Sequence, residues 1–239
     1  MPDAEDDAPA AQLAVLEGLQ RRFLGTVREV DPEVRVPWCG RWRARHVAVH
    51  LGRIHHWAAG QARRRQETPL GRGPFVLDEF YAAQAEELRS TLAALEPDAP
   101  AWTLDSSGVV RFWHRRQTHE TLVHLWDVRA AAGLPLGLDD APWADTVDEV
   151  VTVMQPRQVH LGRMPPLPAR IRLVATDAAR SWELHAAHDA PPGPAVVVEG
   201  PAQDLALLLW RRATPDHDTL TVRGDRGVLD AALAERLVP

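Results

Sequence analysis

The stretch VRFWHRRQTHETLVHLWDVRAAA at residues 110–132 decides the fold class of this 239-residue chain. It predicts a long helix that ends at Gly133 and Pro135, residue types that commonly terminate helices. Three earlier segments show apolar residues at helical spacing: 11–30, 43–64 and 75–95. Four long helices with short or medium connections predict an antiparallel bundle, to which a shorter helix over 142–160 is added.

The pattern changes after a proline-rich segment that begins at Arg163. Beyond it, apolar and polar residues alternate as they do in strands. We expect strands at 169–176, 181–187, 195–199 and 219–223, and helices at 201–210 and 228–237. The predicted fold class is mainly α with two domains: an antiparallel four-helix bundle over 1–162 and a small α+β domain over 163–239.

The composition excludes several classes of protein. With 27 arginines against 33 acidic residues the net charge is −6, so no broad basic surface is offered to a nucleic acid. The single cysteine, Cys39, excludes an intramolecular disulfide and a cysteine-based metal cluster. The N-terminus is acidic, unlike a signal peptide, and no apolar run approaches the ~20 residues of a membrane span. We therefore expect a cytoplasmic protein with no membrane partner.

The chain contains no lysine and no asparagine, and its isoleucines are Ile54 and Ile171. The codons of these three amino acids are rich in A and T. Their scarcity indicates a genome rich in G and C, as in the actinobacteria.

The densest group of chemically active side chains is THETLVHLWD at 118–127. His119 and His124 are five residues apart, about 140° around a helix, so they do not face one metal together. Glu120 and His124 are four apart, about 40°, and lie on one face, which Asp127 continues. Two interpretations remain open for this pair: two metal ligands, or a solvated ion pair on the helix surface.

A third ligand is expected from another helix of the bundle. The segment 43–64 offers four histidines: His46, His50, His55 and His56. His50 lies within an apolar stripe between Val49 and Leu51, so we expect it to point inward, where a ring nitrogen needs a partner. A set of His50, Glu120 and His124 leaves one coordination position open, as catalytic zinc sites do.

Three motifs in order resemble those of the mycothiol-dependent maleylpyruvate isomerases. They are VPWCGRWRARHVAVHLGRIHHWA at 36–58, HETLVHLWDVRAAAG at 119–133, and VEGPAQDLALLLWRR at 198–212 followed by LTVRGD. The resemblance implies a DinB-like bundle followed by a sterol-carrier-like domain. It also implies a divalent metal, usually zinc, on His50, Glu120 and His124, and a low-molecular-weight thiol, mycothiol, bound nearby.

The same resemblance implies a basic residue of the second domain that contacts the substrate. The family's Trp-Gly-Arg ending aligns with Trp210, Arg211 and Arg212, so Arg212 takes the arginine position. Arg211 stands where glycine is usual, and either arginine is a candidate to bind a substrate carboxylate. Helix-terminal arginines are also favoured by the helix dipole alone.

Cis–trans isomerisation of a conjugated enoate needs a nucleophile that adds, permits rotation and leaves. A thiolate suits this role, and a metal lowers a thiol pKa from about 8.5 until the thiol ionises. Cys39 shows no feature that favours ionisation, so we expect an external thiol. We predict a metal- and thiol-dependent isomerase, or an S-transferase acting on an electrophilic substrate. Asp127 and His119 are the candidates to support the site from beside the ligands. Asp127 would orient a ligand imidazole or is a plain surface charge. His119 points away from the ligand face and either lies on the helix surface or contacts the substrate.

Two other functions stay open at this point. The second domain is a candidate to hold an apolar ligand, with the bundle as a scaffold or a metal-bound regulator. Alternatively, the metal activates water for hydrolysis, with Asp127 or His119 as the base. The sequence does not determine the oligomeric state.

Overall fold

The computed structural model describes residues 8–138 and 142–239. They belong to two compact units, Met1–Ala141 and Pro142–Pro239. Each unit is described by itself below. Over the described residues, no helix combines the length and apolar character that crossing a membrane requires.

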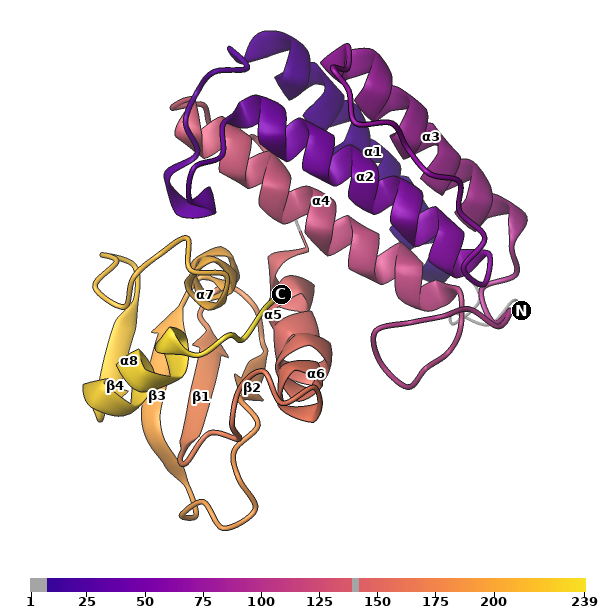
Figure 1. The fold of residues 1–239 in the computed structure, drawn as a ribbon. Coiled ribbons are helices and arrows are strands. Elements are labelled where there is room, and N and C mark those ends of the chain that lie inside the picture. Colours follow the sequence, from indigo (N-terminus) through magenta and orange to yellow (C-terminus); the bar gives the residue numbers. More distant parts are fainter. Residues whose placement is uncertain (1–7, 139–141) are drawn as a thin grey trace. The chain divides into compact units, whose positions relative to one another are not determined.

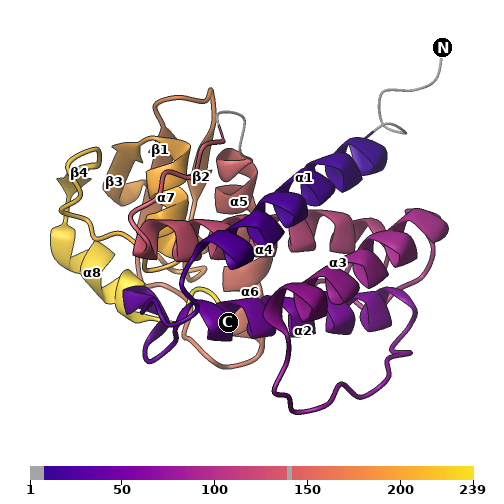
Figure 2. The same ribbon diagram turned by 90° about the horizontal axis from the view of Figure 1, so that it is seen from above.

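The first unit is built from four long helices (Figure 1). They are α1 (Ala8–Glu29), α2 (Ala44–Ala62), α3 (Leu77–Ala94) and α4 (Arg111–Ala131), and a short 3-10 helix, η1 (Pro37–Cys39), precedes α2. Figure 2 shows α1 and α2 on opposite sides of the bundle, and both pack against α3 and α4. The predicted four-helix bundle is thus confirmed, with helix ends within about two or three residues of those expected from helical spacing.

The contacts of α2 with α4 show that these two helices run antiparallel. His50 meets Glu120, His55 meets Gln117 and Trp57 meets Trp113, so residue numbers rise along α2 as they fall along α4. Helix α4 also packs against α1, and most of its side chains are buried on every side. The group at 118–127 therefore lies in the interior of the bundle.

The second unit combines a four-stranded sheet with helices (Figure 1). The sheet has the order β2-β1-β3-β4, and its strands are β1 (Arg170–Ala175), β2 (Ser181–Glu183), β3 (Pro194–Gly200) and β4 (Thr221–Gly224). Strands β1 and β3 are parallel, with Leu173 opposite Val198, and the two outer pairings are antiparallel. Helices α7 (Ala202–Leu209) and α8 (Arg226–Ala234) pack against the sheet. The small α+β domain is thus confirmed.

The segment 142–160 differs from our expectation. It forms a helical run, α5 (Trp143–Glu149), η2 (Val150–Met154) and α6 (Gln155–His160), of which η2 is π-helical. This run belongs to the second unit, because α5 packs against α7. The compact units therefore divide at Pro142, whereas the sequence analysis placed the boundary at Arg163. The π-helical turn lies just before Pro156, which cannot donate a backbone hydrogen bond to the helix.

Candidate metal centre

Three side chains from two helices of the bundle converge on one point. His50 comes from α2, and Glu120 and His124 come from adjacent turns of one face of α4. Their nearest ligand atoms all lie within 4.8 Å of one another. Both imidazole Nε2 atoms lie 3.3 Å from Oε1 of Glu120. The structure thus brings together the three residues that the sequence singled out.

The two carboxylate oxygens of Glu120 have different partners. Oε1 faces the two histidines, while Oε2 forms an ion pair with the Arg116 guanidinium one turn earlier on α4. Burial alone would raise the pKa of Glu120, but Arg116 and the two imidazoles hold it well below its usual range. Glu120 is therefore an anion at neutral pH, and the interpretation as a solvated surface ion pair is wrong because Glu120 and His124 are buried.

His124 is oriented by Asp127. Its Nδ1 lies 2.9 Å from Oδ2 of Asp127, which is fully buried, so Nε2 is left to face Glu120 and His50. Burial would lower the pKa of His124, but hydrogen bonds to Asp127 and Glu120 raise it to about 9. A carboxylate on the far nitrogen of an imidazole is the usual support of a metal-binding histidine. The Cys39 thiol lies 3.5 Å from the same Asp127 oxygen.

The spacing of these atoms fits a zinc ion. Zinc binds histidine nitrogen and carboxylate oxygen at about 2.0–2.2 Å in tetrahedral sites, so two such ligand atoms lie roughly 3.3–3.5 Å apart. The two distances of 3.3 Å from Oε1 of Glu120 to the imidazole nitrogens match this separation. Two histidines and one carboxylate form a common catalytic zinc ligand set, to which an outside ligand adds the fourth position.

Two further histidines of α2 are held within the packing of the bundle. His55 is fully buried, with Nδ1 2.8 Å from Oε1 of Gln117, and burial lowers its pKa to about 4. His56 is held by Glu87 and by the Thr68 carbonyl, each at 2.6 Å. His119 is buried on α4, so its expected place on the helix surface is wrong. Helical spacing placed His119 away from the ligand face, but other parts of the protein cover that side of α4 too, and His119 is buried there.

Arg211 and Arg212 lie in the turn that ends α7 in the second unit. Arg211 has a φ of 60°, in the left-handed region, and the N–H of Arg212 donates to the Leu207 carbonyl at 2.7 Å. This is a Schellman motif, in which glycine is preferred because a side chain strains the left-handed residue. The positive φ at this position explains why the family's motif has glycine where this chain has Arg211.

The side chains of the two arginines differ in their partners. The Arg211 guanidinium donates to the carbonyls of Ala234 and Glu235 at the end of α8, which ties two helix ends together. Arg212 lies over the Trp210 ring, with Cζ 5.6 Å from its centroid, and donates to the Trp210 carbonyl. Arg211 therefore ties the end of α7 to the end of α8, and Arg212 is held against Trp210.

Sequence reasoning missed Arg116 and the contact of Cys39 with Asp127. Arg116 precedes Glu120 by four residues, so the spacing that identified the ligand pair contained its signal as well. The Cys39 contact joins residues 88 positions apart and had no sequence signal.

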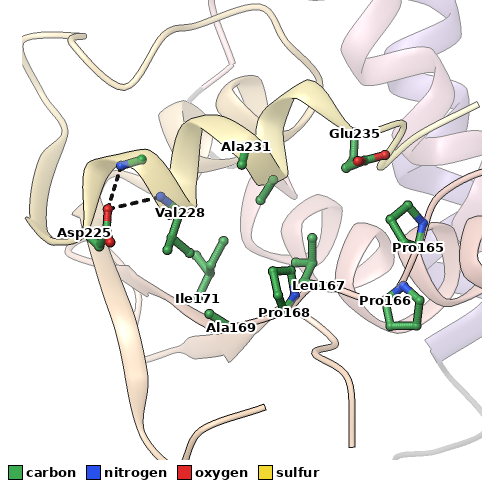
Figure 3. Close-up of a pocket in the computed structure, with 12 residues that line it drawn as sticks. Pro165, Pro166, Leu167, Pro168, Ala169, Ile171, Asp225, Val228, Ala231 and Glu235 are labelled. Carbon is green, nitrogen blue, oxygen red and sulfur yellow. Dashed lines mark hydrogen bonds between the residues drawn. The ribbon is translucent and has the colours of Figure 1, made fainter. Parts of the chain in front are cut away.

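A cavity of about 490 Å³ lies within the second unit (Figure 3). Figure 3 shows the proline-rich segment 165–169 on one side of it and α8 on the other, with Ile171 of β1 between them. The lining is mostly apolar, and its two carboxylates are Asp225 and Glu235. Asp225 caps α8 by accepting from the backbone of Gly227 and Val228. This is a typical size for a small-molecule site.

Comparison with known proteins identifies the family. The model of the mycothiol maleylpyruvate isomerase N-terminal domain matches residues 13–129, and the model of the C-terminal domain of the same family matches residues 142–231. No curated protein matches the chain. The chain is similar to the crystal structure of a mycothiol-dependent maleylpyruvate isomerase, with 14% identity, 93% of this chain and 95% of that chain covered, and a TM-score of 0.63. A histidine-to-alanine mutant of such an isomerase matches with 14% identity, the same coverage and a TM-score of 0.64.

The fold and the two domain matches define a thiol-dependent enzyme of the isomerase class. The chain belongs to the mycothiol maleylpyruvate isomerase family.

Proposed function

We propose that this protein uses a zinc ion on His50, Glu120 and His124 to activate mycothiol, which isomerises a carboxylate-bearing enoate of the maleylpyruvate type. The observation that carries the proposal is the convergence of two imidazole nitrogens on one carboxylate oxygen, each at 3.3 Å, which is close to the separation of neighbouring ligands around a zinc ion. Both partners are then small molecules, a thiol and an electrophile, and no nucleic acid is involved. The host would be a bacterium that makes mycothiol, with the protein in its cytoplasm.

A bound divalent zinc would lower the pKa of a coordinated thiol, so that the thiolate is available at neutral pH. The residues of this chain hold the site ready for that chemistry. Asp127 fixes the His124 ring by its Nδ1, and Arg116 fixes the Glu120 carboxylate by Oε2. The three ligand atoms therefore need little rearrangement when the metal binds.

The substrate needs a cation for its carboxylate and for the enolate that forms when the thiolate adds to the double bond. Arg212 fits this role, because a guanidinium binds a carboxylate with two parallel hydrogen bonds. Thiolate addition converts the double bond into a single bond, rotation follows, and expulsion of the thiolate restores the double bond. An S-transferase would stop after the addition, with the proton that the thiol lost returned to the enolate carbon.

A metal-dependent hydrolase is less well supported by the same side chains. Asp127 is fully buried and its Oδ2 is shared by His124 and Cys39. A carboxylate engaged in this way is poorly placed to take a proton from water.

Elemental analysis of protein purified without chelator tests the proposal. We expect about one zinc per chain, lost in His50→Ala and His124→Ala. The zinc-loaded protein is then assayed for isomerisation of maleylpyruvate with and without mycothiol. Failure to bind zinc, or turnover that is independent of thiol, would contradict the proposal.

A second candidate function is ligand binding by the second unit, favoured by its apolar cavity of about 490 Å³. This candidate predicts that an apolar fluorescent probe such as ANS binds the metal-free protein. It further predicts that Val228→Trp, which fills the cavity from α8, abolishes that binding without changing the zinc content.

A further inference from the structure

The face that α2 and α4 share is built in successive levels. At the first level, His50 of α2 meets Glu120 and His124 of α4. Two turns away along both helices, the rings of Trp57 and Trp113 lie 5.1 Å apart. In sequence, Arg53 of α2 and Arg116 of α4 fall between the metal ligands and these aromatic rings, and the Arg53 guanidinium contacts Gly71 and Phe75 of the loop after α2.

The position of Arg53 follows from helix geometry. It lies three residues after His50 and four before Trp57, and residues three or four apart are neighbours on a helix surface. Three residues also rise about 4.5 Å along the axis. Arg53 is therefore within one helical turn of a metal ligand, and its side chain is half-buried.

The surroundings of Arg53 leave part of its guanidinium available. One nitrogen, Nη2, donates to the Gly71 carbonyl at 2.5 Å, and Cζ lies 5.4 Å from the centroid of the Phe75 ring. Among the residues that the structure describes, no carboxylate forms an ion pair with Arg53, whereas Arg116 is paired with Glu120. Arg53 is thus a half-buried, positioned cation whose remaining N–H donors are not matched by an anion.

A pocket of about 360 Å³ lies beside this cation. It is lined by Arg53, His56 and Trp57 of α2 and by residues 67–70 of the loop that follows. Both nitrogens of His56 are engaged, by Glu87 and by the Thr68 carbonyl, so His56 holds the loop against α2. Glu67, an exposed carboxylate, also lines the pocket. Its negative charge repels an anionic group of a ligand at the outer rim.

We propose that Arg53 binds a carboxylate of the substrate and that Trp57 forms the adjoining wall of this subsite. The inference rests on the proposed function for the identity of the reacting group, but the subsite is made by the first unit alone. It predicts substrates whose carboxylate is close to the reacting double bond, because Arg53 is one helical turn from His50. Arg53 then selects for an anionic enoate over a neutral ester, because the ester supplies no counter-charge to the guanidinium.

The test is calorimetric binding of maleate, a small cis-enedioate, and of its neutral dimethyl ester to the zinc-loaded protein. We expect the wild type to bind maleate and not the ester. In Arg53→Gln we expect maleate binding to be weaker by about tenfold to a hundredfold, the usual effect of losing a charged hydrogen bond. Arg53→Lys keeps the positive charge but lacks the paired N–H donors of a guanidinium, so its affinity for maleate should lie between those of the wild type and Arg53→Gln.

The matched control is Arg72→Gln, which removes an exposed arginine from the same loop and should bind maleate as the wild type does. Zinc content and far-ultraviolet circular dichroism establish that each variant is loaded and folded. Wild-type maleate affinity in a folded Arg53→Gln protein would overturn the inference, and so would equal losses in the Arg53 and Arg72 variants.

Kinetics separate this inference from the proposed function. If the enzyme isomerises maleylpyruvate with mycothiol but Arg53→Gln leaves its KM unchanged, the subsite is wrong and the proposed function stands. If no isomerisation occurs but maleate binding still depends on Arg53, the proposed function is wrong and the subsite stands.

Discussion

The ligand cluster of the first unit and the two-arginine turn of the second unit differ in what fixes their side chains. In the cluster, the spacing of Glu120 and His124 along one regular helix places their ligand atoms together. In the turn, the direction of Arg211 follows from a left-handed backbone residue that ends α7. A site on a regular element is therefore readable from residue spacing, whereas a site on a turn depends on backbone conformation that spacing does not encode.

The largest expected effect tests the cluster itself. Glu120→Gln removes the anion on which both imidazoles converge while it keeps the shape of the side chain. We expect zinc binding to be lost and activity to fall by roughly a hundredfold or more, since the metal supplies several kcal/mol of stabilisation. Zinc content and thiol-dependent turnover measure this. The matched control is Glu87→Gln, a carboxylate of the same bundle that binds His56, and it should keep its zinc.

A smaller effect is expected from the residue that orients His124. Asp127→Asn keeps an oxygen but replaces the carboxylate, so the His124 ring loses a charged acceptor on Nδ1. We expect zinc affinity to fall by about ten- to a hundredfold. Competition with a chromophoric chelator measures the affinity. Affinity equal to that of the wild type would show that Asp127 does not support the ligand.

His55 lies on the same helix as the ligand His50 but is a buried packing residue, so its replacement should affect stability and not metal binding. Burial lowers its pKa to about 4, so between that value and its ordinary pKa near 6.5 the unfolded chain binds a proton that the folded chain does not. The free energy of unfolding is therefore unaffected by protonation of His55 above about pH 6.5. As the pH falls from 6.5 toward 4, protonation of His55 in the unfolded chain lowers the free energy of unfolding by on the order of 3 kcal/mol.

Thermal unfolding of the wild type and of His55→Gln from pH 4 to pH 7 checks this. The variant should show a weaker dependence on pH over that range, and its zinc content should remain that of the wild type. A pH dependence identical to that of the wild type would show that His55 does not titrate as its burial requires.

The smallest effect concerns the turn. Arg211→Gly and Arg211→Ala both remove the guanidinium, but glycine adopts a positive φ without strain. We expect the glycine variant to be more stable than the alanine variant by about 1 kcal/mol, measured by chemical denaturation. Both should keep isomerase activity if Arg212 is the arginine of this turn that contacts substrate. Loss of activity in both, with Arg212→Gln unaffected, would exchange the two roles.

The sequence predicted the bundle, the order of strands and helices after residue 163, and the three residues that converge. These depend on local periodicity and on which face of a helix a residue occupies. It did not predict that His119 is buried, because spacing tells which face a residue lies on but not whether another helix covers that face. It also missed the contact of Cys39 with Asp127, which depends on how the segment before α2 folds back onto α4.

The central claim is that an external thiol binds a metal held by His50, Glu120 and His124. The most direct test replaces zinc with cobalt and follows the near-ultraviolet spectrum as mycothiol is added, with Cys39→Ser as the background so that no protein thiol contributes. We predict a thiolate-to-cobalt charge-transfer band that saturates with mycothiol and is absent in His124→Ala. A cobalt-loaded protein that shows no such band at saturating mycothiol would contradict the claim.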